Sequence, residues 1–100
     1  MDSSSNVVAQ ISFFHSRKGG RSVPFGQGFS PRLILDASPI EYFTILNIDE
    51  TETIFPGDQV KIELKIKGNP GIFLHEGASF DLLEGEKIIG NGTIMKILEQ

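Results

Sequence analysis

The stretch that most constrains the fold is Gln59–Lys67, which reads QVKIELKIK. Apolar and polar or charged side chains alternate along it, so an extended chain would present one apolar face and one polar face. The apolar positions are Val60, Ile62, Leu64 and Ile66. A period of two is typical of an antiparallel strand with one face in a core and the other in water. Turn-forming Pro-Gly and Gly-Asn-Pro-Gly clusters precede and follow the stretch, so we expect a strand with defined ends.

Five further segments carry the β-branched and aromatic residues of strands between turn signals. They are residues 6–15, 32–37, 42–48, 79–83 and 87–98. The chain is 100 residues long, which suits a single domain. We therefore predict an all-β domain over residues 6–100, either a small closed barrel or a sandwich, after a disordered tail at residues 1–5. Gly90 and Gly92 share one face of the last strand and predict a close backbone approach there.

Composition narrows the class of protein further. The chain has no cysteine, which excludes disulfides and thiolate metal sites. The N-terminus lacks the basic and apolar regions of a signal peptide. No apolar run approaches the ~20 residues of a membrane helix. We expect a cytoplasmic protein with no membrane partner. The net charge of −4 makes the chain a poor generic binder of nucleic acid, and no DNA binding is expected.

Catalytic and metal-binding patterns are not evident. His15 and His75 are the two histidines that could activate a nucleophile, and no Gly-x-Ser-x-Gly elbow accompanies either. The acidic run at 49–52 lacks the glycine and the frame of an EF-hand loop. We therefore expect no catalytic residue, no metal site, no cofactor and no enzymatic activity.

Three motifs resemble the C-terminal domain of elongation factor Tu. Residues 19–33, GGRSVPFGQGFSPRL, are similar to its Gly-Gly-Arg, Pro-Phe and Gly-aromatic-x-Pro segment. Residues 55–58, FPGD, are similar to its Pro-Gly-Asp turn, and residues 83–92, LEGEKIIGNG, to its last hairpin. The resemblance covers about residues 7–98. It implies a closed six-stranded antiparallel barrel, with Phe25 and Phe29 turned onto the core.

The GTPase motif of that family is missing, because no Gly-rich phosphate loop with Lys and Ser or Thr occurs in the sequence. We expect a free-standing module or a cut fragment. The resemblance also implies a site for tRNA, whose T-stem the family's domain contacts. The residues that would serve it here are Arg17, Lys18, Arg21 and Lys87.

Departures from the family pattern favour a protein partner over tRNA. Leu83 and Glu86 replace an Arg and a Gly of the last hairpin, and residues 36–39, DASP, replace the Thr-rich end of the second strand. New carboxylates near a phosphate path are repulsive. An acidic patch would instead attract a basic protein surface. It comprises Asp49, Glu50, Glu52 and Asp58. We consider three roles for a protein-binding module: an immunity-type inhibitor, a translation-factor-like adaptor or an accessory barrel. The alternative function is RNA binding in translation.

Overall fold

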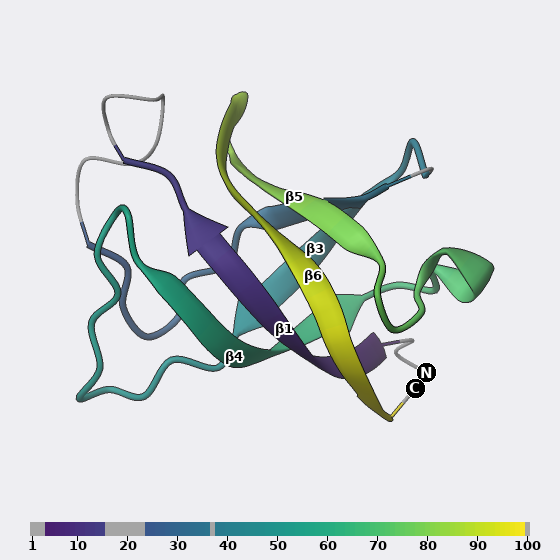
Figure 1. Cartoon of the computed structure of the whole chain (residues 1–100), viewed down its shortest axis with the longest axis horizontal. Coiled ribbons are helices and arrows are strands. Elements are labelled where there is room, and N and C mark those ends of the chain that lie inside the picture. Colours follow the sequence, from purple (N-terminus) through teal and green to yellow (C-terminus); the bar gives the residue numbers. More distant parts are fainter. Residues whose placement is uncertain (1–3, 16–23, 37, 100) are drawn as a thin grey trace.

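The alternating segments close on one another into a barrel, as a computed structural model of the chain shows (Figure 1). It describes residues 4–15, 24–36 and 38–99. The strands are β1 (Ser4–Phe13), β2 (Arg32–Leu35), β3 (Glu41–Leu46), β4 (Gln59–Lys67), β5 (Ser79–Glu84) and β6 (Lys87–Glu99). Their order around the barrel is β1-β4-β3-β2-β5-β6, and β6 pairs with β1 to close it. Every pairing is antiparallel. The predicted fold is confirmed, and of the two architectures the barrel is the one formed.

Strand bounds differ from the sequence predictions at several ends. β1 begins at Ser4, so Ser4 and Ser5 are not part of a tail but pair with Lys67 and Ile66 of β4. β3 begins and ends earlier than predicted. β2 is shorter than predicted, although the backbone N–H of Asp36 still donates to the carbonyl of Ser79 at 2.8 Å. Residues 1–3 of the predicted tail lie outside the described part of the chain.

Alternation along each strand builds the core. In β1 the residues that point inward are almost fully buried, and the intervening ones are partly or fully exposed. The same holds in β3, where Tyr42, Thr44 and Leu46 are buried. The core contributions of the six strands are Val7, Ala9, Ile11, Phe13, Leu33, Leu35, Tyr42, Leu46, Leu64, Ile66, Phe80, Leu82, Ile89 and Ile94. Burial of these apolar side chains is the main favourable term in folding.

The segment before β2 packs onto this core through its aromatic residues. Phe25 is completely buried, and its ring centroid lies 4.6 Å from that of Phe13 and 4.6 Å from that of Phe29. The backbone of Phe25 also exchanges hydrogen bonds with Ile54, at 2.7 and 3.0 Å. Phe25 and Phe29 therefore turn back onto the core as predicted, and the first ties the segment before β2 to the loop between β3 and β4.

Close packing of β6 against β1 explains the two glycines of β6. A Cβ atom placed on Gly92 would lie 2.4 Å from the carbonyl oxygen of Gln10 and 2.6 Å from the ring of Phe80. A Cβ on Gly90 would lie 2.7 Å from the carbonyl oxygen of Ser12. Because both contacts include backbone atoms, a side chain at either position would force the strands apart. The predicted close approach is confirmed.

Candidate functional site

The predicted acidic patch lies in the loop between β3 and β4 and at its end. Glu52 accepts a hydrogen bond from the backbone N–H of Asp49 at 3.2 Å, and its own N–H donates to the carbonyl of Asp49 at 2.9 Å. Asp58 accepts a bond from the N–H of Phe55 at 2.9 Å. Glu50 is exposed at the turn. Two of the four carboxylates thus stabilise local turns, and their bonded oxygens are less available to form ion pairs with a partner.

The predicted RNA-binding set is only partly described by the structure. Arg17, Lys18 and Arg21 lie outside the described residues. Lys87 begins β6, is exposed, and pairs with Glu84 across the hairpin from β5. The structure therefore leaves this set as a prediction.

The two histidines lie in separate connecting segments. His15 packs against the turn before β4, since a Cβ on Gly57 would lie 2.4 Å from its ring. His75 is exposed, and its Nδ1 lies 3.0 Å from the carbonyl oxygen of Glu76. Over the described ranges, no group of three or more His, Cys, Asp or Glu side chains is placed to hold a metal ion.

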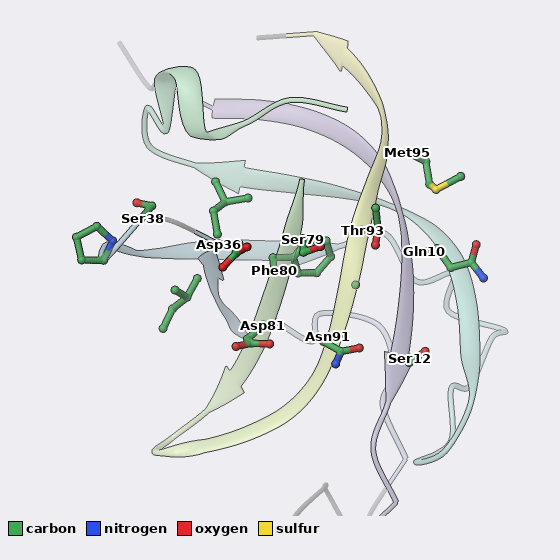
Figure 2. A pocket seen from close by; sticks show the side chains of 14 residues that line it. Gln10, Ser12, Asp36, Ser38, Ser79, Phe80, Asp81, Asn91, Thr93 and Met95 are labelled. Carbon is green, nitrogen blue, oxygen red and sulfur yellow. The ribbon is translucent and has the colours of Figure 1, made fainter. Parts of the chain in front are cut away.

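A groove of about 950 Å³ crosses the outer face of β1, β6, β5 and β2. Figure 2 shows its labelled side chains in two rows that run across the strands. One row consists of Ser12, Asn91 and Asp81, and the register places Asn91 opposite each of the other two. The second row consists of Gln10, Thr93, Ser79 and Asp36. Side chains opposite one another on paired strands lie within contact distance, so the rows form one continuous polar surface.

The groove reaches down to the sheet between its polar side chains. Gly92 and the buried Phe80, which are paired on the inner face of β6 and β5, also contribute to its lining. Met95 borders it beyond Thr93, and Ile34 and Pro39 line it on the β2 side. The result is a long polar floor between apolar borders.

Charge in the groove is of one sign. Of the 14 residues described along it, Asp36 and Asp81 are charged and the others are neutral. The carboxylate of neither Asp takes part in a hydrogen bond or ion pair within the described part of the chain. Asp36 is exposed and Asp81 is partly buried. Amide and hydroxyl groups beside two free carboxylates suit a cationic or hydrogen-bonding ligand.

Sequence reasoning missed most of this groove. Asp36, Asp81 and Asn91 were included only in predicted strands, with Asp36 also in the segment that departs from the family pattern and Asn91 also in the hairpin motif; none was predicted as a site residue. The polar residues of β1, β5 and β6 that line the groove occupy outward positions of their strands, which the alternation indicates. The rows depend on the register between strands far apart in sequence, which local patterns do not specify.

Comparison with known families is decisive for the lineage of the chain. A family model described as the elongation factor Tu C-terminal domain matches residues 1–98. The chain belongs to this family. Membership makes it a translation-factor-like binding module and agrees with the barrel topology described above.

Two family-like motifs have clear structural roles in this elongation factor Tu C-terminal domain. The Pro-Gly-Asp turn is closed by Asp58, while Gly57 adopts φ of 96°, a conformation that suits glycine. The Pro-Phe segment supplies Phe25 to the core. The Gly-Gly-Arg residues at 19–21 lie outside the described ranges. The described residues include no helix long and apolar enough to cross a bilayer.

Proposed function

We propose that this barrel is a non-enzymatic module that binds a protein partner through a basic segment laid in the groove of β1, β6, β5 and β2. The observation that carries the proposal is the groove itself, in which two carboxylates with no partner among the described residues lie among neutral amides and hydroxyls. Lys and Arg side chains of a partner would pair with Asp36 and Asp81. The translation-factor-like adaptor is the version this arrangement favours.

Charge supports a protein partner over RNA at this groove. A nucleic acid backbone would bring phosphates against two carboxylates, with no described cation along the groove to offset them. A basic segment would meet complementary charge, which raises the association rate and the specificity of binding. The amides of Gln10 and Asn91 can donate to and accept from the backbone of an extended peptide.

The arrangement of the histidines supports a binding role over catalysis. The hydroxyls of Ser12, Ser79 and Thr93 line the groove, but neither His15 nor His75 does. A serine or threonine nucleophile needs an adjacent general base to become reactive. The groove residues are therefore suited to hydrogen bonding.

Affinity capture with matched variants tests this proposal. The double variant Asp36→Asn/Asp81→Asn removes both charges and keeps the shape of the groove. Immobilised wild-type and variant proteins are incubated with lysate of the source cells after nuclease treatment, and bound proteins are quantified. We expect a basic protein to be enriched on the wild type and reduced about tenfold on the double variant, since two charge-assisted contacts are lost.

The control is Glu50→Gln/Glu52→Gln, which removes two charges from the predicted acidic patch. It should retain the captured protein. Loss of capture with this control, and retention with the groove variant, would place the partner on the β3–β4 loop instead. Capture of tRNA alone, released by salt, would replace the proposal with the RNA-binding alternative.

A further inference from the structure

A second surface of the barrel exposes apolar side chains. Along β3 the outward residues include Phe43, which is 65% exposed, and Ile45, which is 38% exposed. The residue between them is buried Thr44, whose hydroxyl donates to the carbonyl of Pro31 at 2.7 Å. That bond holds Thr44 inward, and the strand's alternation then directs Phe43 and Ile45 to solvent. Large exposed apolar residues that adjoin one another mark interaction surfaces.

Cations flank these apolar residues on both neighbouring strands. Phe43 pairs with Arg32 of β2 and with Lys67 of β4, and Ile45 pairs with Lys65. Lys61 continues the outward series along β4. We call this set, Arg32, Phe43, Ile45, Lys61, Lys65 and Lys67, the β3 face. In the described ranges no ion pair joins Lys61, Lys65 or Lys67 to a carboxylate.

The carboxylates of the same surface are already engaged. Glu41 forms an ion pair with Arg32. Glu63 accepts a hydrogen bond from the side-chain amide of Asn47 at 3.3 Å. The three lysines of β4 therefore remain to attract negative charge from outside the chain.

Hollows border both apolar side chains. One of about 520 Å³ lies beside Phe43, between residues 26–32 and residues 83–85. Another of about 460 Å³ lies beside Ile45, and Lys65 contributes to its wall. Apolar anchors beside pockets are typical of the residues that dominate binding energy in protein interfaces.

We propose that the β3 face is a second docking surface, whose partner is a protein segment in which carboxylates alternate with apolar side chains. The apolar groups contact Phe43 and Ile45 and enter the hollows, and the carboxylates pair with the lysines of β4. Single-stranded nucleic acid is the less suitable occupant. Such binders stack successive bases on several aromatic side chains, whereas the β3 face offers Phe43 as its aromatic residue and carries Glu41 and Glu63 beside the lysines.

The test uses a short synthetic peptide of alternating Glu and Leu, titrated into the ¹⁵N-labelled full chain at low salt. We expect concentration-dependent shifts of amide resonances in β3, β4 and the neighbouring hollows, with a dissociation constant below about 1 mM. Raising the ionic strength should weaken binding, because exposed charge pairs are screened. A peptide of alternating Lys and Leu should leave these resonances unchanged.

Two variants and two controls locate the contacts. Lys67→Glu should weaken peptide binding about fivefold. The control Lys96→Glu makes the same change at an exposed position of β6 and should leave binding unaltered. Phe43→Ser should weaken binding about tenfold. Ile72→Ser removes a side chain that is 87% exposed outside the β3 face and should have no effect on binding. Because Phe43 is exposed, its replacement should leave the urea concentration at the unfolding midpoint unchanged.

Three results would overturn the proposal. The Glu–Leu peptide could produce no shifts up to about 1 mM. The Lys–Leu peptide could bind equally well, which would remove the role of the lysines. A short oligouridylate could shift the β3 and β4 resonances while the Glu–Leu peptide does not, which would make the surface a nucleic acid site.

Discussion

The two outer surfaces of the barrel differ in shape and in charge, although the same alternation builds both. The groove is a hollow that carries neutral polar residues and two carboxylates without a partner in the described part of the chain. The β3 face carries exposed large apolar side chains and cationic ones. β2 separates them: its outward residues change from Arg32 through Ile34 to Asp36 just beyond its end. The inward residues determine the barrel, so the outward residues are free to make two unlike surfaces.

The difference in charge between the groove and the β3 face affects which partners each can bind. A closed barrel has no free sheet edge running round it, so partners must be recognised by side chains on its outer face. Opposite charge on the two surfaces disfavours one partner occupying both. An adaptor that joins a basic protein to an acidic one needs this separation.

The largest effect should come from adding a side chain on the inner face of β6, beneath the groove. Gly92→Val places a side chain against the carbonyl oxygen of Gln10 and the ring of Phe80. We expect a loss of about 3 kcal/mol in the free energy of unfolding, because overpacking forces backbone shifts. Urea unfolding measures it. The matched change on the other side of the barrel is Gly26→Val, beside Phe43, where an added Cβ meets nothing within 4 Å. Equal losses for both variants would contradict the close approach of β6 to β1.

Prediction from sequence succeeded where one pattern indicated both that a segment is a strand and which of its sides faces the core. In Gln59–Lys67 each apolar residue alternates with a charged one, so the strand and its inward side were both evident. In β3 the run from Tyr42 to Leu46 is almost wholly apolar, and its period does not say which side faces the core. The buried hydroxyl of Thr44, bonded to Pro31, decides that. The exposed Phe43 could not be found without it.

The candidate site was less predictable than the fold for a related reason. The acidic patch was predicted because its carboxylates lie close together along the chain. The groove brings Ser12, Asp81 and Asn91 together through pairings of β6 with β1 and β5. Such pairings follow from barrel closure and from the β-bulge irregularities recorded in both pairings. Local sequence does not contain this information.

Substitutions in the acidic patch should have a smaller effect on the free energy of unfolding than filling the space at Gly92. Asp58→Ala removes the acceptor for the backbone N–H of Phe55 and should lower the free energy of unfolding by about 1 kcal/mol. Glu50→Ala, at an exposed turn, should change it by less than about 0.5 kcal/mol. Both values come from urea unfolding at neutral pH. If the two variants were equally stable, the hydrogen bond of Asp58 would have no measurable weight, and Asp58 would again be open to a partner.

The smallest effect we predict is the influence of one surface on the other. Asp81 lies on β5 and Lys67 on β4, and β2 and β3 stand between those strands around the barrel. At physiological ionic strength charges more than about 8 Å apart are largely screened. Asp81→Asn should therefore change the affinity of the β3 face for the Glu–Leu peptide by less than about 1.5-fold, well below the effect of Lys67→Glu. At about 0.01 M salt, where the screening length is about 30 Å, the same variant should bind the acidic peptide more tightly. A change of several fold at physiological salt would mean that the barrel transmits a structural change between its surfaces, and the two could not then act as independent docking sites.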